Sequence, residues 1–191
     1  MIEKEQHMLM YMKKYLGWDK DKLPYKTIVK VYPRGHYLLR AGEMETNFHF
    51  LVSGIVESTL VAKNGEEKIM DFFFLNSFFC SMSSIISKKP TQFNIRCLTE
   101  CTIETVTNKD YGDALKKSIT LNIISRKLLE DFYLYRVKKE RDMLTKTASE
   151  RYLDLIKDRQ DIIKDVPLEK IAKYLGIHPR SLSRIRRSVY K

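Results

Sequence analysis

The pattern of the sequence changes near residue 110, and this change is the strongest constraint on the fold. Over residues 27–107, short apolar or alternating runs are separated by turn residues, which is typical of antiparallel β-structure. Beyond Tyr111, residues 112–144 contain no proline and a single glycine, Gly112. Such a stretch is typical of one continuous helix. The sequence therefore predicts an α+β chain in which a β domain precedes a set of helices.

The β part is predicted to hold about eight strands, the number found in a jelly roll. Asn64 and Gly65 separate two strand-like runs, and both tolerate the positive φ angles of a tight hairpin turn, so we expect a hairpin there. Ahead of the strands, apolar residues at helical spacing over 3–16 predict a short amphipathic helix that ends at Gly17. We assign residues 1–111 to an antiparallel β-roll or jelly-roll domain.

Residues 112–145 are assigned to one long helix, roughly 45 Å long at 1.5 Å per residue. A helix that is apolar over more than half of its circumference must cover two surfaces. We therefore expect one side to pack on the β domain and the other on a second copy of the chain. A helix buried entirely within one domain is the alternative. The stripe assigned to dimerisation is Leu121, Ile124, Leu128, Phe132 and Tyr135, and the neighbouring stripe is Ile119, Ile123, Tyr133 and Val137.

Residues 146–191 are predicted to form a separate helical domain. Thr147 and Glu150 fit a capping box at the start of its first helix. The whole chain has a formal charge of +11, and this segment holds twelve Lys or Arg against six acidic residues. A surplus of positive charge attracts polyanions such as nucleic acid. A solvated basic face without a ligand is the alternative interpretation of the charge alone.

The same segment has the spacing of a helix-turn-helix. Pro167 and Pro179 suit the first turns of two short helices, 167–175 and 179–188. Gly176 between them can adopt the left-handed conformation that ends the first helix. The apolar positions expected to form the core are Ile171, Ala172, Leu175, Ile177, Leu182 and Ile185.

The second short helix carries a cationic face. Arg180, Arg184 and Arg187 fall at i, i+4 and i+7, opposite the apolar side. A helix fits the major groove of B-form DNA, and arginine donates two parallel hydrogen bonds to guanine. We therefore assign base contacts to Arg180 and Arg184. A helical bundle that binds no nucleic acid is the alternative. The side chains assigned to phosphates are His178, Ser181, Ser183, Arg186, Arg187 and Lys191.

Three segments carry a family resemblance: LLRAGEMETNFHFLVSG (Leu38–Gly54), the NGEE hairpin, and LEKIAKYLGIHPRSLSRIRR. The first is similar to a signature of cyclic-nucleotide-binding domains. In these segments and in the order of its parts, the whole chain resembles the Crp/Fnr superfamily of bacterial transcription regulators, in the short form common in Bacteroidetes. The resemblance implies a β-roll sensor domain and a homodimer that reads a palindromic site in double-stranded DNA. It also implies contact with RNA polymerase and a small-molecule effector of unidentified chemistry.

The sensor part departs from the family pattern over Phe74–Cys97. The phosphate-binding cassette of cyclic-nucleotide binders needs a Gly-Glu pair for the ribose and an Arg-Ser or Arg-Thr pair for the phosphate. No Gly-Glu pair occurs in this stretch, and Thr91-Gln92 stands where the arginine pair would be. A buried cyclic phosphate would lack its charge partner, so we predict no cyclic AMP binding of the usual kind. Lys88 and Lys89 are interpreted as an exposed turn, with a site for a different anion as the alternative.

Other classes of protein are disfavoured by what the sequence lacks. The cysteines Cys80, Cys97 and Cys101 form no CxxC pair and are interpreted as free thiols, so no metal or iron–sulfur cofactor is predicted. No catalytic constellation or phosphate-binding loop is evident, so no enzyme is predicted. No apolar run approaches the length of a membrane helix, and no signal peptide is evident, so a cytoplasmic protein without a membrane partner is predicted.

The alternative function is a β-roll ligand-binding or protein-interaction module that no longer binds DNA. The arginine face discriminates between the two functions, because only a DNA-binding helix should bind duplex DNA with a steep dependence on salt.

Overall fold

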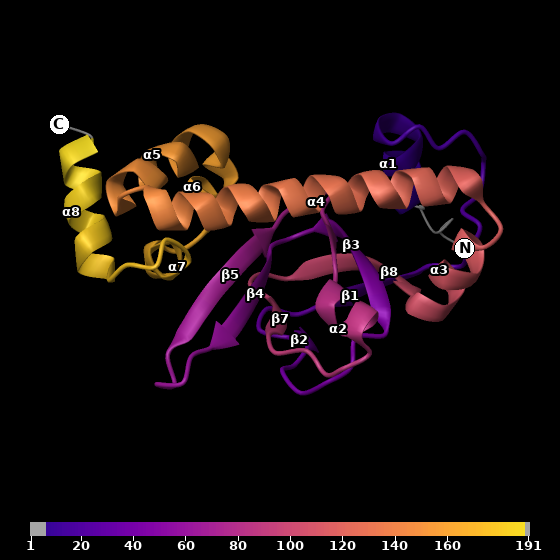
Figure 1. The fold of residues 1–191 in the computed structure, drawn as a ribbon, viewed down its shortest axis with the longest axis horizontal. Coiled ribbons are helices and arrows are strands. Elements are labelled where there is room, and N and C mark those ends of the chain that lie inside the picture. Colours follow the sequence, from indigo (N-terminus) through magenta and orange to yellow (C-terminus); the bar gives the residue numbers. More distant parts are fainter. Residues whose placement is uncertain (1–6, 190–191) are drawn as a thin grey trace. The chain divides into compact units, whose positions relative to one another are not determined.

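The computed structural model describes residues 7–189, and its ribbon is drawn in Figure 1. Residues 3–6 of the predicted first helix and the predicted phosphate contact Lys191 lie outside the described residues. The chain divides into two compact units. One unit joins the chain up to Ser58 with Phe73–Leu129, and the other joins Thr59–Phe72 with the chain from Glu130 onward. Part of a β-hairpin therefore belongs to the same unit as the C-terminal helices.

The described strands form two four-stranded sheets, which confirms the predicted jelly-roll-like fold. The strands are β1 (Ile28–Tyr32), β2 (Tyr37–Leu39), β3 (Asn47–Ser53), β4 (Val56–Val61), β5 (Glu67–Phe73), β6 (Phe78–Phe79), β7 (Asn94–Cys97) and β8 (Cys101–Thr107). One sheet has the order β1-β8-β3-β6 and the other β2-β7-β4-β5. Strand β8 pairs antiparallel with both β1 and β3. This order places strands that are distant in sequence side by side.

Alternating side chains of these strands fill the core of the β-roll. Ile95 and Cys97 of β7, like Cys101 and Ile103 of β8, are two residues apart and point to one side of their sheets. Both cysteines are fully buried free thiols, as the sequence indicated for them. The burial of this apolar surface is the main source of stability for the fold. The buried members of the cluster are Leu39, Leu51, Val56, Phe79, Ile95, Cys97, Cys101 and Ile103.

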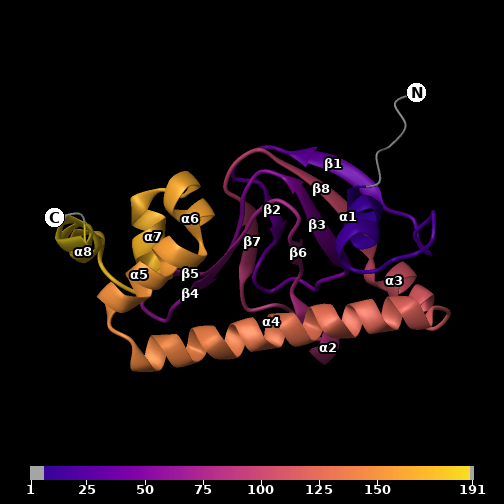
Figure 2. The same cartoon turned by 90° about the horizontal axis from the view of Figure 1, so that it is seen from above.

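A second core forms where three helices pack on the outside of the roll. Helix α1 (His7–Tyr15) lies against β3 (Figure 2), with α3 (Asn108–Leu115) and the start of α4 (Ile119–Thr145) in the same cluster. The first turn of α1 is fixed by Glu104, a fully buried carboxylate that accepts a hydrogen bond from the backbone N–H of Met8 at 2.7 Å. The buried members of this second cluster are Met8, Met12, Trp18, Phe50, Ala114, Leu121 and Ile124.

The prediction of one helix over 112–144 is wrong at its start, because the chain forms α3 and α4 instead. Two capping side chains explain the break. Thr107 accepts a hydrogen bond from the backbone N–H of Asp110 at 3.0 Å and starts α3 before Gly112. Ser118 accepts one from the backbone N–H of Leu121 at 3.2 Å and starts α4. Each hydroxyl satisfies an amide that a helix start leaves without an intrahelical partner.

The hairpin between β4 and β5 also differs from the prediction. We expected positive φ angles at both Asn64 and Gly65, but within the described residues only Gly65 of the pair has one, at 80°. The loop is longer than a two-residue turn and is closed by the backbone N–H of Ala62, which donates to the carbonyl of Glu66 at 2.9 Å. The Asn64 side chain accepts a hydrogen bond from the Glu66 N–H at 3.1 Å instead of entering the left-handed region. The side-chain hydrogen bond therefore replaces the second positive φ angle.

The C-terminal part holds short helices around a small apolar core. They are α5 (Ala148–Asp158), α6 (Gln160–Asp165), α7 (Leu168–Tyr174) and α8 (Pro179–Val189). Helix α6 was not predicted, and neither was α2 (Met82–Ser87) in the β-roll. Four of the six predicted core residues, Ile171, Ala172, Leu175 and Leu182, are buried, whereas Ile177 and Ile185 are partly buried.

Over residues 7–189, none of the helices combines the length and the apolar character needed to cross a bilayer.

Candidate nucleic-acid interface

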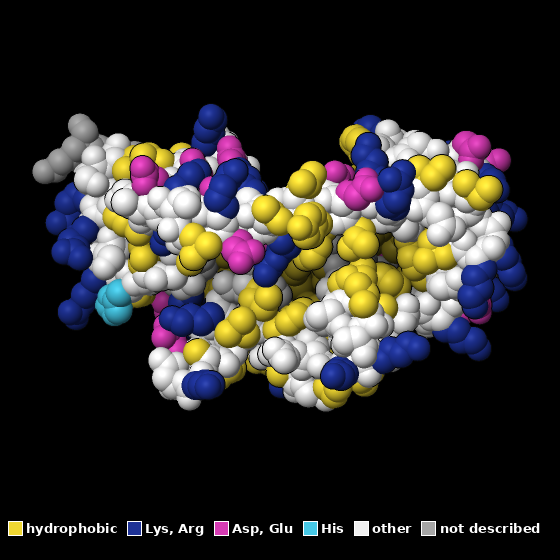
Figure 3. Space-filling model, viewed as in Figure 1, with side chains coloured by type: hydrophobic (Ala, Val, Ile, Leu, Met, Phe, Trp, Pro, Cys, Tyr) yellow, Lys and Arg dark blue, Asp and Glu magenta, His cyan; other side chains and the backbone are white. Residues whose placement is uncertain are grey.

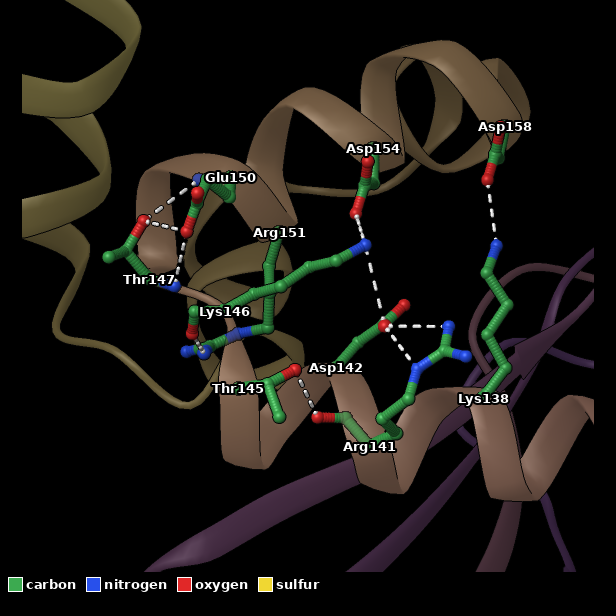
Figure 4. A network of polar contacts seen from close by, with 10 residues as sticks. All are labelled: Lys138, Arg141, Asp142, Thr145, Lys146, Thr147, Glu150, Arg151, Asp154 and Asp158. Carbon is green, nitrogen blue, oxygen red and sulfur yellow. Dashed lines mark hydrogen bonds and ion pairs between the residues drawn. The ribbon is translucent and has the colours of Figure 1, made fainter.

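The helical domain begins at the predicted capping box (Figure 4). The Thr147 hydroxyl accepts a hydrogen bond from the Glu150 N–H at 3.3 Å, and the Glu150 carboxylate accepts one from the Thr147 N–H at 2.8 Å. This hydrogen bond from the Thr147 backbone is the largest of the effects that lower the pKa of the Glu150 carboxyl. The capping box therefore fixes where α5 begins, two residues after α4 ends.

Ion pairs connect the last turns of α4 to α5 along one side (Figure 4). The Lys138 ammonium lies 2.9 Å from the Asp158 carboxylate, and Lys146 lies 2.6 Å from Asp154 and 3.4 Å from Asp142. The pKa of the Asp158 carboxyl is lowered by its hydrogen bond with Lys138. Because Lys138 and Asp158 are about half exposed, such pairs each contribute little to stability. These ion pairs therefore orient α5 along α4 but add little to the free energy of unfolding.

The turn of the helix-turn-helix has the predicted geometry. Gly176 has a φ of 70°, and the backbone N–H of Ile177 donates to the carbonyl of Ala172 at 3.0 Å. This reversed hydrogen bond after a left-handed glycine is the Schellman ending of a helix. Arg151 of α5 supports the turn, because its guanidinium donates to the carbonyl of Leu175 at 3.0 Å. The corner between α7 and α8 is therefore fixed from both sides.

The start of α8 is capped by a side chain that we had assigned to phosphate contact. The Nδ1 atom of His178 accepts a hydrogen bond from the backbone N–H of Arg180 at 3.2 Å. The side chain as a whole is exposed. His178 therefore helps to form the helix that presents the arginines, a role that its position before Pro179 could have indicated.

Helix α8 is sharply divided into a buried and a cationic side. Leu182 is fully buried, whereas Arg180, Arg184, Arg186 and Arg187 are all exposed. In Figure 3 the Lys and Arg side chains, in dark blue, gather over α8. The four guanidinium groups are thus held on one rigid element with their charges toward solvent.

The predicted serine contacts lie on the same helix. Ser183 is exposed, and its hydroxyl donates to the carbonyl of Pro179 at 3.1 Å, whereas Ser181 is partly buried. A shallow hollow of ≈ 310 Å³ is lined by Leu168 of α7 and by Ser183, Arg186 and Arg187. The predicted DNA contacts within the described residues are therefore brought together on one helix, with the hollow along one edge.

The predicted dimerisation stripe is wrong for its first two residues. Leu121 is 0% and Ile124 is 4% exposed, and both lie in the core that α4 shares with α1 and β3. Leu128 is partly buried against the same core, Tyr135 is partly buried, and Phe132 is exposed. The sequence shows two apolar stripes but does not show which of them the chain covers itself.

The neighbouring stripe of α4 is the exposed one. Ile119 is 81% exposed, and Tyr133 is 65% exposed, with Ile123 and Val137 also exposed. Hydrophobic side chains, in yellow, are visible along α4 in Figure 3. These large apolar side chains are therefore not covered by the chain's own core.

A buried acid that we did not predict lies against the segment that corresponds to the phosphate-binding cassette. Glu45 is 5% exposed, and its carboxylate accepts hydrogen bonds from the backbone N–H groups of Ser81 at 3.1 Å and Asn47 at 3.0 Å. Burial raises the pKa of this carboxyl, although the backbone hydrogen bonds act in the opposite direction. Thr91, where the family has arginine, is buried and accepts a hydrogen bond from the Ser81 hydroxyl at 2.9 Å.

The nearby basic groups do not neutralise Glu45. The Nε2 atom of His49 lies 3.9 Å from its carboxylate, but burial lowers the pKa of the imidazole to about 4, so the ring is neutral at pH 7. Lys88 and Lys89 are exposed, as the sequence indicated, and Lys88 ends α2 with a φ of 54°. Glu45 therefore has no charged histidine beside it at pH 7.

Comparisons with known proteins show which domain family and which solved folds this chain is similar to. Residues 29–118 match the family of the cyclic nucleotide-binding domain. FixK2 from Bradyrhizobium japonicum is similar in structure, with a TM-score of 0.71 and 16% identity over 86% of this chain and 85% of FixK2. A structure from Eubacterium rectale assigned to the Crp/Fnr family of transcriptional regulators has a TM-score of 0.69 and 15% identity, over 85% of this chain and 78% of that one.

A CooA variant from Carboxydothermus hydrogenoformans is also similar, with a TM-score of 0.66 and 16% identity over 85% of this chain and 75% of CooA. No curated protein matches the chain in sequence. The matched segment thus defines a β-roll domain of the cyclic-nucleotide-binding class. Over 85–86% of its length the chain shares its fold with FixK2 and with the structure assigned to the Crp/Fnr family, in agreement with the resemblance seen in the sequence.

Proposed function

We propose that the protein is a DNA-binding transcription regulator of the Crp/Fnr type that reads duplex DNA with α8. The observation that supports this most strongly is the exposed row of Arg180, Arg184 and Arg187 opposite the buried Leu182. Arg180 and Arg184, near the start of the helix, would contact base edges in the major groove, with Arg186, Arg187 and the serines on phosphates.

The proposed active form is a homodimer that pairs through α4. The exposed stripe of α4 is suited to pack against the same stripe of a second chain, because a two-fold axis brings identical apolar side chains together. This stripe consists of Ile119, Ile123, Tyr133 and Val137. A two-fold pair presents two α8 helices, which fits a palindromic site whose halves are about one helical turn, roughly 34 Å, apart. RNA polymerase would be the further partner that such a dimer helps or hinders.

The proposed sensor domain does not take cyclic AMP in the usual way. A phosphate in the cassette would lie near the Glu45 carboxylate without an arginine to pair with. Burying an unpaired anion next to a like charge is costly. An effector, where one acts, would have to be neutral or cationic in the part that meets this site.

The proposal is tested by selecting binding sequences from a random duplex library and titrating the full chain with the recovered duplex. The expected result is a palindromic sequence, and an affinity for random duplex that falls about a thousandfold or more between 50 and 200 mM salt. The control is Lys157→Ala, which removes one exposed charge from α5 outside the proposed interface and should leave the recovered sequence unchanged. Absence of duplex binding at 50 mM salt would favour the β-roll module without DNA function.

A further inference from the structure

A cluster of one buried and three partly buried polar side chains lies within the second unit. It joins β5, α4 and α7 through Asp71, Tyr135, Lys139 and Tyr174. Asp71 is 6% exposed, although it stands in an apolar strand next to Phe72. A buried carboxylate of this kind is stable only where neighbouring groups hold it.

The hydrogen bonds of the cluster form an ordered chain. The Tyr135 hydroxyl donates to the Asp71 carboxylate at 2.9 Å, so the hydroxyl of Tyr174, 3.2 Å from that of Tyr135, is the donor in the next hydrogen bond. Phe72 packs against the Tyr174 ring with a centroid distance of 5.5 Å. The side chain of Tyr174 therefore connects the first helix of the helix-turn-helix to both α4 and β5.

Lys139 closes the cluster from the side of α4. Its ammonium donates to the carbonyl of Met70, lies 4.0 Å from the Asp71 carboxylate, and lies 3.8 Å above the centre of the Tyr174 ring. The groups that face it are Asp71 from β5, Tyr135 and Arg136 from α4, Arg159 from the α5–α6 junction, and Tyr174 from α7.

We propose that Asp71, Tyr135, Lys139 and Tyr174 form a latch that holds α7, and with it the recognition helix α8, against α4, and that raising the pH closes this latch more tightly. The ion pairs along the outside of α4 and α5 include exposed groups, and the chain connection between these helices is two residues long. Rotation of the helix-turn-helix about that connection must break the buried cluster first. A cavity of ≈ 220 Å³, lined by Tyr135, Lys139 and Tyr174, lies beside the cluster.

The sign of the pH effect follows from the burial of Lys139. Burial lowers the pKa of this lysine to about 8, against the opposing effect of Asp71, whereas an exposed lysine has an ordinary value of about 10.4. The closed latch therefore holds its proton less tightly than the open one. Between these two values the closed form gains stability as the pH rises, and the gain is lost as the pH falls toward 7.

The experiment is hydrogen exchange on the full chain at pH 7 and pH 9, after correction for the intrinsic rate. Protection of the α7 amides should rise about tenfold between these pH values, which is the linkage expected from the two pKa values. In Lys139→Met the corrected protection should stay constant within twofold. The matched control for this change is Lys127→Met on the exposed side of α4.

A second variant separates a latch from a merely structural contact. Tyr135→Phe keeps the ring and removes the hydroxyl, and should speed exchange of the α7 amides about tenfold at pH 7 while the α4 amides of residues 130–145 remain protected. Lys127→Met, at an exposed residue of the same helix outside the proposed dimer stripe, should change neither. Parallel acceleration of α4 and α7 in Tyr135→Phe would overturn the proposal, and so would a pH effect that persists in Lys139→Met.

The consequence of the latch for DNA reading rests on the proposed function, but its test does not. Hydrogen exchange is measured without DNA. If the exchange results are as expected but the chain binds no duplex, the proposed function is contradicted and the latch is not. Conversely, if the chain selects a palindromic sequence but exchange of the α7 amides is the same at both pH values and in all variants, the latch is contradicted and the proposed function is not.

Discussion

The two units of the molecule use charged side chains in opposite ways. In the first unit the carboxylates of Glu45, Glu57 and Glu104 are buried and hydrogen-bonded within the fold. In the second, Arg180 and Arg184 are held on α8 with their charges in solvent. A buried carboxylate that is hydrogen-bonded within the fold contributes to the structure of the protein. A positive charge on an exposed helix remains able to bind a polyanion. The buried acids of the first unit therefore stabilise its fold, whereas the arginines of α8 in the second unit stay exposed to solvent.

The largest effect is expected from removing one internal acid. Glu57 is fully buried and accepts a hydrogen bond from Arg96 at 2.8 Å, so Glu57→Leu would remove the carboxylate that pairs with this guanidinium. We expect a loss of about 3 kcal/mol in the free energy of unfolding, measured by denaturant titration. Glu100→Leu, at an exposed glutamate of the same unit, should change the free energy by less than about 0.5 kcal/mol. Equal losses in the two variants would show that the internal charge has no special role.

A smaller effect is expected from changing the shape of one external base without changing its charge. Arg184→Lys keeps the positive charge but removes the planar fork that binds guanine, so discrimination between the selected and a random duplex should fall by about 1–3 kcal/mol. The salt dependence should stay the same, because the charge is retained. Arg187→Lys, at a proposed phosphate contact, is the control and should preserve discrimination. Binding titrations with both duplexes measure this, and unchanged discrimination in Arg184→Lys would remove the assigned base contact.

The smallest effect is expected at the cassette. Because burial raises the pKa of the Glu45 carboxyl, the folded state takes up its proton more readily than the unfolded state. This group therefore adds stability as the pH falls through its raised pKa toward the ordinary value, and the addition is lost as the pH rises again. Glu45→Gln should flatten this part of the stability profile, measured as Tm against pH.

The same melting measurement tests the ligand prediction. Saturating cyclic AMP should leave the Tm of the unchanged protein where it is, because a ligand that binds only the folded state would raise it. A clear increase in Tm would show that the cassette accepts the nucleotide despite Glu45.

The helix-turn-helix was predictable because its determinants are local. Thr147 and Glu150 are three residues apart, and the glycine corner at Gly176 lies between two prolines that start helices. Capping and turn chemistry of this kind depends on neighbours along the chain. The strand pattern of the β-roll was readable for the same reason, since alternation is a property of each run.

The error in the dimerisation stripe and the unpredicted buried acids come from contacts between distant residues. Nothing near Leu121 shows that its stripe, not that of Ile123, faces the first unit's own core. Asp71 meets Tyr135 across 64 positions of sequence, and Glu45 meets Ser81 across 36. A single acid within the apolar run of β5 was the one local signal for Asp71. Tertiary packing thus decided the points that local chemistry left open.

The path of the chain has a practical consequence. Because the peptide crosses between the two compact units at residues 58–59, 72–73 and 129–130, a single cut cannot separate them. A fragment that starts at Lys146 would leave Tyr174 without its hydroxyl partner on α4 and its ring partner on β5. Such a fragment would lack part of the second unit, whereas a chain that joins residues 59–72 to residues 130–191 would contain all of it.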